Sequence, residues 1–161
     1  MASNSRLPYN YSRIGDLFYT FVNKDGIAYN IYFFPLPSFC PEYGKTYSFS
    51  IEPEDTRPHP MDVRIVLTVI DILRRFFEVH ENAMLMVCDN TDGKEAKRRK
   101  LFDRWYEQYG DSSIDKYDAA AHADDYHLFA SIYFRHDNPN GHHLRDAFYD
   151  MMKQDPYEIV I

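Results

Sequence analysis

The sequence has no long apolar run, few glycines and few cysteines, and each shortage excludes a class of protein. Its longest apolar stretch, residues 83–88, is far shorter than the roughly 20 residues of a membrane-spanning helix. With six glycines and no glycine-rich phosphate loop, a dinucleotide-binding or P-loop site is not expected. Cys40 and Cys88 are predicted to be free thiols because nothing in their spacing indicates a disulfide or a metal pair. The first residues lack an apolar leader, so the protein is predicted to be cytoplasmic.

Positive charge is also in short supply, since 18 Lys and Arg face 25 Asp and Glu and leave a net charge of −7. General nucleic-acid binding is not expected, because that affinity comes mainly from neutralising phosphates with basic side chains. The basic residues gather in residues 94–104, where Lys97, Lys100 and Arg104 share one face of a predicted helix. This face is either an ordinary solvated surface or an anion site, and both interpretations stay open.

Aromatic residues are abundant, with 14 Tyr, 12 Phe and one Trp making up 17% of the 161 residues. Together with an apolar fraction of 45%, this supplies the core of one domain. We therefore predict a single domain over residues 1–161, in which the polar residues 1–15 form a loose N-terminal arm.

The first half of the chain predicts three strands and a helix. Strands over 17–22 and 27–34 are separated by residues 23–26, where Asp-Gly supplies the positive φ of a hairpin turn. Residues 45–52 alternate in polarity, which indicates a third strand with one solvated face. A mostly apolar helix is predicted over 61–80, with Pro60 in its first turn. Its polar residues form one narrow solvated stripe: Arg64, Thr68, Asp71, Arg75 and Glu78.

The second half predicts alternating strands and helices. We expect a central strand over residues 84–88 and then a helix over 92–109, capped by Asp92 and Glu95. A loop over 111–126, a strand over 128–135 and a last helix over 144–154 follow. The pattern also allows an edge strand over 157–161. The order β-β-β-α-β-α-β-α predicts an α+β fold with a mixed, mainly antiparallel sheet and packed helices.

Five of the seven histidines lie within 22 residues, at positions 122, 127, 136, 142 and 143. A metal ion would need three or four such ligands to converge, and this spacing fits no helical metal motif. The adjacent His142 and His143 are expected to point apart. No metal site is therefore predicted.

The segment CDNTDGKEAKRRKLFDRW, residues 88–105, resembles a family of small uncharacterised bacterial proteins, a domain of unknown function, and this resemblance implies no activity. The order of elements is also similar to the core of the GNAT superfamily of N-acyltransferases. Residues 84–88, Asn90, Ala96 and the pair Leu101-Phe102 stand in the order of that family's strand, Asn, Ala and Leu-Tyr.

The resemblance to GNAT enzymes implies an acyl-CoA site and a set of candidate residues. The cofactor would meet Arg57, Arg64, Asn90, Lys97, Lys100 and Arg104. Glu52 would act as general base. Phe102 occupies the position of the tyrosine that protonates the departing thiolate in that family, so Tyr106 or Tyr109 would take this role. The family's glycine-containing phosphate turn is missing, since residues 55–62 hold two prolines and no glycine.

Two hypotheses follow. The first, favoured by the lost turn and the lost tyrosine, is a binding module on a GNAT-like fold, without catalysis or cofactor, that takes a protein or small-molecule partner. The tyrosines predicted to line its binding surface with outward hydroxyls are Tyr19, Tyr29, Tyr32, Tyr47 and Tyr133. Self-association is left open. The alternative is an acyl-CoA-dependent N-acyltransferase.

Overall fold

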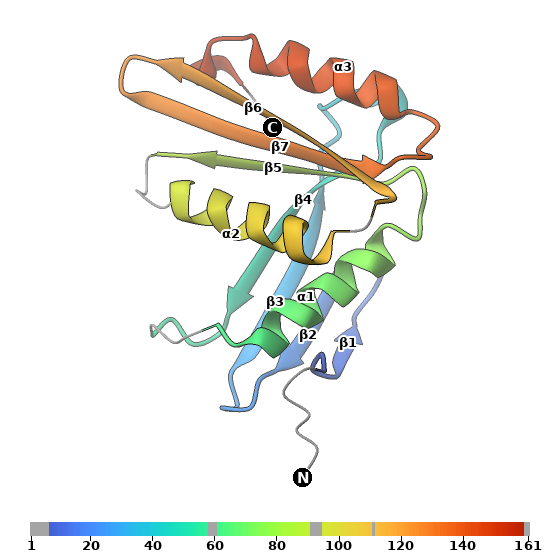
Figure 1. Ribbon diagram of the computed structural model, residues 1–161, viewed down its shortest axis with the longest axis vertical. Coiled ribbons are helices and arrows are strands. Elements are labelled where there is room, and N and C mark those ends of the chain that lie inside the picture. Colours follow the sequence, from blue (N-terminus) through green and yellow to red (C-terminus); the bar gives the residue numbers. More distant parts are fainter. Residues whose placement is uncertain (1–6, 58–60, 91–94, 111, 160–161) are drawn as a thin grey trace. The chain divides into compact units, whose positions relative to one another are not determined.

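The computed structural model describes residues 7–57, 61–90, 95–110 and 112–159, and it confirms an α+β fold with a mixed sheet (Figure 1). Seven strands form one sheet in the order β1-β2-β3-β4-β5-β7-β6. The strands are β1 Tyr11–Arg13, β2 Phe18–Val22, β3 Ala28–Pro35, β4 Thr46–Pro53, β5 Ala83–Asp89, β6 Ile114–Ala123 and β7 Tyr126–Arg135. The α-helices of the described residues are α1 Val63–Phe76, α2 Glu95–Tyr109 and α3 Gly141–Met152.

The chain divides into two compact units. Unit 1 comprises the chain up to Phe34 together with Phe49–Glu78. Unit 2 comprises Pro35–Ser48 and the chain from Val79 onwards. The single domain proposed from the sequence stays a prediction.

The predicted hairpin of unit 1 is confirmed by the antiparallel pairing of β2 with β3. Gly26 in its turn has a φ of 78°, which glycine adopts without the steric cost of a Cβ. The Asn23 side chain accepts hydrogen bonds from the backbone N–H groups of Asp25 and Ile27, both 2.9 Å long. These contacts fix the hairpin register, and register decides which side chains face α1.

Helix α1 covers one face of the unit 1 sheet. Every second residue of β2 and β3, such as Tyr19, Ile31 and Phe33, is buried on this side. The Phe33 and Phe76 rings stack with centroids 4.2 Å apart. Burial of these large apolar side chains is the main source of stability in unit 1.

The loose arm predicted for residues 1–15 is not what the structure shows for residues 7–13. Strand β1 pairs antiparallel with β2, and the hydroxyls of Tyr9 and Tyr11 donate to Asp62 and Asp71 at 2.7 and 2.6 Å. The solvated stripe predicted on α1 is also wrong at Thr68, which is fully buried and accepts the Tyr9 N–H at 2.8 Å. The polar stripe is therefore the surface on which residues 7–13 are held.

In unit 2 the sheet lies between two helices. The α3 side is an apolar core that contains Leu85, Ile132 and Phe148. Alternate residues of β7 face α2 instead, where the Tyr106 and Tyr133 rings lie 5.9 Å apart. The prediction of a central strand near residues 84–88 is confirmed, because β5 pairs parallel with β4 and antiparallel with β7.

Three local predictions need correction or fall outside the described residues. The loop predicted over 111–126 is largely strand β6, paired along its length with β7. In the range 157–161, where an edge strand was allowed, the first two residues belong to the short 3-10 helix Pro156–Glu158, and residues 160–161 lie outside the described residues. The capping residue Asp92 and the first-turn Pro60 lie outside the described residues, and the N-cap of α1 is Asp62.

Candidate functional site

The face of the unit 1 sheet opposite α1, called the outer face here, is the candidate site. Its side chains alternate along β1 to β4 with those that face α1. The residues that define the outer face are Ser12, Ile14, Phe18, Thr20, Val22, Ala28, Asn30, Tyr32, Phe34, Ser50, Glu52 and Glu54. Among the described residues of unit 1, α1 is the one helix, and it lies on the other side.

A row of aromatic rings crosses the outer face. The rings of Phe18 and Tyr32, directly opposite one another in β2 and β3, stack with centroids 4.5 Å apart and an interplanar angle of 15°. Tyr32 stacks in turn on Phe34, with centroids 5.5 Å apart. Phe34 and Ile14 are 50% and 54% exposed, so this apolar surface is in contact with solvent.

Polar side chains of the outer face are tied to one another. The Thr20 hydroxyl donates to the Asn30 side-chain oxygen at 3.1 Å, and the Asn30 amide donates to Glu54 at 3.4 Å. The Ser50 hydroxyl donates to Glu52 at 3.4 Å. The two glutamates are exposed, and the outer face carries no Lys or Arg. The site therefore joins an aromatic row to an acidic margin.

The predicted tyrosine surface is wrong for three of its five members. Tyr19, Tyr29 and Tyr133 are 1%, 2% and 4% exposed, because they lie on helix-covered sides of the sheet. Burial raises the pKa of each hydroxyl. Tyr32 lies on the outer face, and Tyr47 is half-buried in the part of β4 that belongs to unit 2.

The N-terminus of α1, where the GNAT resemblance places a phosphate, already holds a carboxylate. Asp62 caps the helix by accepting the Ile65 N–H at 2.9 Å, and its other oxygen accepts the Tyr9 hydroxyl. Arg64 donates to the Leu7 carbonyl and lies 4.0 Å from the Tyr9 ring centroid. A cofactor phosphate would have to displace a negative charge from the position that favours anions.

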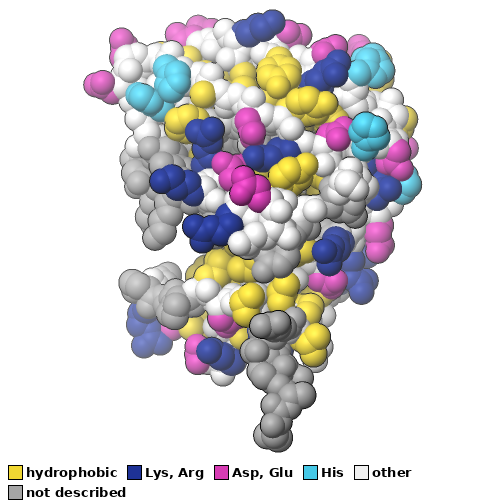
Figure 2. All heavy atoms as spheres, in the orientation of Figure 1, with side chains coloured by type: hydrophobic (Ala, Val, Ile, Leu, Met, Phe, Trp, Pro, Cys, Tyr) yellow, Lys and Arg dark blue, Asp and Glu magenta, His cyan; other side chains and the backbone are white. Residues whose placement is uncertain are grey.

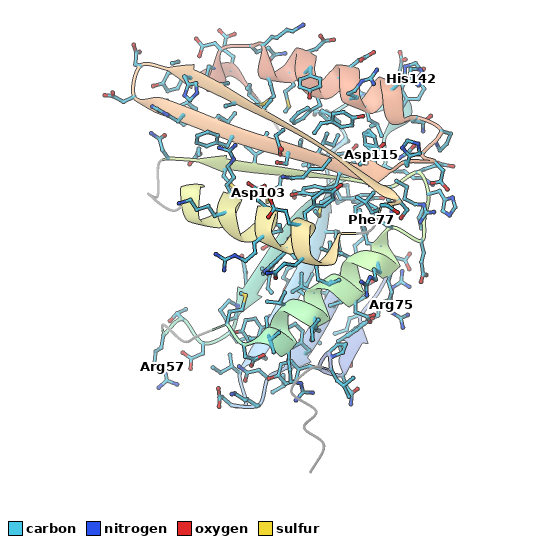
Figure 3. The ribbon with its side chains drawn as sticks, viewed as in Figure 1. Arg57, Arg75, Phe77, Asp103, Asp115 and His142 are labelled. Atoms are coloured by element: carbon cyan, nitrogen blue, oxygen red, sulfur yellow. The ribbon has the colours of Figure 1, made fainter. Side chains whose placement is uncertain are left out.

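The other residues implied by that resemblance also have structural roles. Arg57 forms an exposed ion pair with Asp55, two residues earlier, and projects away from the ribbon (Figure 3). The Asn90 amide binds the β6–β7 turn, donating to the Asp125 carbonyl at 2.5 Å and accepting the His127 N–H at 3.1 Å. The Tyr106 hydroxyl donates to the Ile114 carbonyl at 2.7 Å. Glu52 belongs to the acidic margin of the outer face.

The basic face of α2 is only partly described, because the Lys97 side chain lies outside the described residues. Lys100 and Arg104 are exposed. Anionic and cationic side chains are interspersed over the region of α2 in Figure 2. Arg99 pairs with Asp103 at 4.0 Å and lies over the Phe129 ring at 4.7 Å. The anion site remains a prediction.

Sequence reasoning missed a charged cluster between α2 and β6. Lys116 is 11% exposed and contacts Asp103 at 2.5 Å and Asp118 at 3.2 Å. Burial acts to lower the pKa of Lys116, but the two carboxylates outweigh it and raise the pKa. The Ser131 hydroxyl donates to Asp118, and Asp103 projects from α2 toward the strands (Figure 3). Lys116 and Asp118 are two residues apart, so a strand over this segment would have predicted that both lie on the same face.

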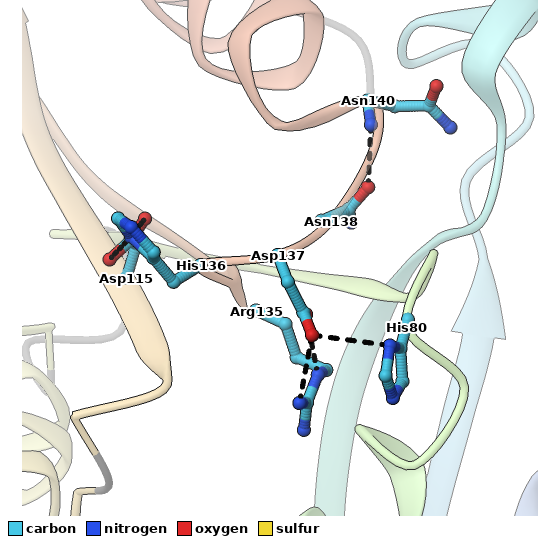
Figure 4. Close-up of polar contacts among 7 residues, drawn as sticks. All are labelled: His80, Asp115, Arg135, His136, Asp137, Asn138 and Asn140. Atoms are coloured by element: carbon cyan, nitrogen blue, oxygen red, sulfur yellow. Dashed lines mark hydrogen bonds and ion pairs between the residues drawn. The ribbon is translucent and has the colours of Figure 1, made fainter.

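The histidines form separate contacts rather than one cluster. His80 pairs with Asp137 at 3.3 Å and His136 pairs with Asp115 at 3.1 Å (Figure 4). The Arg135 guanidinium holds the pKa of Asp137 below its usual value. His142 and His143 do not point apart, since their ring centroids are 3.9 Å apart. No group of three or more potential ligands that could hold a metal ion occurs in the described part of the chain.

The fold and site define an α+β protein in which no described helix of unit 1 lies on the aromatic outer face of that unit. Residues 61–150, more than half of the chain, match the Family of unknown function (DUF6169), and the protein belongs to this family. No curated protein and no solved structure matches the chain. None of the described helices has the length and apolar character needed to cross a membrane.

Proposed function

We propose that this protein is a non-catalytic binding module that docks a protein partner on the outer face of unit 1. The observation that carries the proposal is the stacked aromatic row of Phe18, Tyr32 and Phe34, in which Phe34 is exposed and the other two rings are half-buried. Stacked rings are held in place before binding, so little side-chain entropy is lost when a partner covers them. Aromatic residues also dominate the energetic centres of protein interfaces.

The absence of catalysis is supported by how the candidate catalytic residues are used. The Tyr106 hydroxyl donates a hydrogen bond to the Ile114 backbone carbonyl, and burial raises the pKa of that hydroxyl. Phe102 has no proton to give at the position of the family's tyrosine. Asp62 fills the N-terminus of α1. The contacts of Tyr106 and Asp62 are therefore accounted for by structural roles in the fold.

The proposal is tested by using the immobilised protein to capture binding partners from a lysate of the cells in which it naturally occurs. Phe34→Ser removes an exposed ring of the outer face, and Tyr157→Ser removes an exposed ring of unit 2 as a matched control. We expect a partner that the native chain and Tyr157→Ser retain and that Phe34→Ser loses about tenfold or more. Circular dichroism checks that both variants are folded. A captured set that does not depend on Phe34 contradicts the proposal.

An acyl-CoA-binding function is the second candidate, and the sheet order favours it. The order of the elements is the part that resembles GNAT enzymes, and within the sheet β4 pairs parallel with β5. Its register comprises Thr46↔Ala83 and Tyr47↔Met84, and β5 pairs onwards to Asp89 with β7. Backbone groups of β5 beyond Met84 could then receive the amide groups of a CoA chain.

Thermal unfolding with acetyl-CoA separates the two candidates. A ligand at a hundred times its dissociation constant stabilises the folded state by about 2.7 kcal/mol. A rise in the unfolding temperature at millimolar acetyl-CoA, absent with adenosine and pantetheine alone, supports the second candidate. An unchanged unfolding temperature would contradict acyl-CoA binding, and the binding module would then be the one remaining candidate of the two.

A further inference from the structure

We infer that the partner of the outer face is a basic amphipathic helix of another protein. This inference rests on the proposed function and adds the chemistry of the partner. It follows from the shape of the apolar surface and from the sign of the charges at its margin.

The outer face has the shape that a helix fits. Its apolar side chains lie on β2, β3 and the end of β1, where the Ile14 N–H bonds the Phe18 carbonyl. Neighbouring strands are about 4.7–4.9 Å apart and a helix is about 10–12 Å wide, so one helix covers two to three strands. The opposite face of the same sheet is already covered in this way by α1, through the stacking of Phe76 on Phe33. An apolar stripe of the partner helix would rest on Phe18, Tyr32 and Phe34.

Charge selects a basic partner. The charged residues of the outer face are Glu52 and Glu54, both exposed and both acidic. They lie on or directly after β4, beside the end of β3 that holds Ala28 and Asn30, as the bonds from the Glu54 N–H to the Ala28 carbonyl and from Asn30 to Glu54 show. Tyr32 and Phe34 follow further along β3. A partner helix that runs along β3 from Phe34 toward Ala28 has its flank above β4, where its Lys or Arg side chains reach these carboxylates. An arginine at the centre could also stack on the exposed Phe34 ring.

The same charges argue against the other occupants of an open sheet face. A second copy docked through this face would bring two acidic margins into one interface, where like charges repel. An anionic membrane surface would be repelled by the glutamates as well. The net charge of −7 adds a long-range attraction for basic partners and speeds their association.

The experiment measures binding of two designed helical peptides to the full chain by fluorescence anisotropy. Each peptide has about five helical turns with leucine on one face; the polar face is lysine in one and glutamate in the other. Affinities are compared for the native chain, the double variant Glu52→Lys and Glu54→Lys, and a control double variant Glu42→Lys and Glu107→Lys. The control makes the same charge change at exposed sites in unit 2.

We expect the native chain and the control to bind the lysine peptide about tenfold or more tightly than the outer-face double variant does. The glutamate peptide should show the reverse preference. Equal affinity of all three chains for the lysine peptide overturns the inference. A native dimer in light scattering that Phe34→Ser dissociates also overturns it, because a second copy then occupies the face.

The outcomes separate this inference from the proposed function. If Phe34→Ser abolishes capture of a partner but charge reversal at Glu52 and Glu54 leaves peptide affinity unchanged, the inference of a basic helical partner is wrong. The proposal of a binding module is then still supported. If Phe34→Ser changes neither capture nor peptide binding, the outer face is not a docking surface and both are wrong.

Discussion

At the scale of single residues, Thr68 joins the N-terminal segment to α1. Its hydroxyl accepts the Tyr9 backbone N–H at 2.8 Å and donates to the Arg64 carbonyl at 2.6 Å. Thr68 is fully buried and Tyr9 is 6% exposed, so water does not readily replace these bonds. A backbone N–H buried without a partner costs about as much as a lost hydrogen bond.

Thr68→Val keeps the shape of the side chain and removes its hydroxyl. The Tyr9 N–H then stays buried and unpaired, so we expect the free energy of unfolding to fall by about 1–3 kcal/mol. Urea unfolding followed by circular dichroism measures this change. Limited proteolysis should also show faster cleavage near residues 7–13. Thr68→Ser is the control, because it retains the hydroxyl and should keep the segment protected; equal cleavage of both variants would contradict this role.

At the scale of elements, local sequence signals were strong enough to predict some helices and strands but were absent for others. The hairpin was predictable because Asp25-Gly26 fixes the turn, and α1 because its apolar residues recur at helical spacing. Strand β6 was missed because acidic residues and residues 119–121, all alanine, have low strand propensity. Its pairing with β7 overrides that propensity. The placement of Tyr9 depended on contacts with α1, more than fifty residues away in sequence.

The candidate site was predictable only in part for a similar reason. Alternation along β2 and β3 predicted two faces, and both faces carry aromatic residues. Tyr19 and Tyr29 lie on one face and Tyr32 on the other, and the sequence does not say which face α1 covers. The side of a sheet that stays open is decided by the packing of the helix, which is a property of the folded chain.

Strand β6 gives a prediction that separates its two faces. Ala120 is exposed and pairs with Phe129, whereas Ala121 is 7% exposed and belongs to the core below α3. Ala120→Val raises strand propensity and adds a cross-strand contact, so we expect about 0.5 kcal/mol of added stability. Ala121→Val overfills the core and should cost about 1–3 kcal/mol. Urea unfolding of both variants measures the difference, and effects of equal sign would argue against the assigned register.

At the scale of the whole molecule, the abundance of tyrosine makes stability depend on alkaline pH. In seven of the described tyrosines burial is the largest cause of a raised pKa. These residues are Tyr9, Tyr11, Tyr19, Tyr29, Tyr106, Tyr126 and Tyr133. For Tyr11 the pKa rises to about 12, because burial and the hydrogen bond to Asp71 both favour the neutral hydroxyl. The raised pKa of Lys116 acts in the same direction.

The folded state holds these protons more tightly than the unfolded state, in which tyrosine has a pKa of about 10. The resulting stability is therefore fully present below about pH 10 and is lost as the pH rises through the folded pKa values. For Tyr11 this loss should be complete near its folded pKa of about 12. A fully buried group such as Tyr133 contributes a slope of at most about 1.4 kcal/mol per pH unit. We expect the urea midpoint to be steady between about pH 8 and 9 and to fall steeply above about pH 10.

Circular dichroism measures that midpoint, and absorbance at the tyrosinate band should rise together with the loss of secondary structure. Tyr133→Phe is the matched variant, because its hydroxyl is buried and makes no hydrogen bond of normal geometry with the described residues. The phenylalanine fills the same space and cannot ionise, so the alkaline slope should become shallower while stability near neutral pH is kept. A urea midpoint that does not change between about pH 9 and 11 would show that the folded state does not suppress ionisation of these tyrosines. The aromatic rings of this chain would then be less buried than the packing of α1 and α2 on the sheet requires.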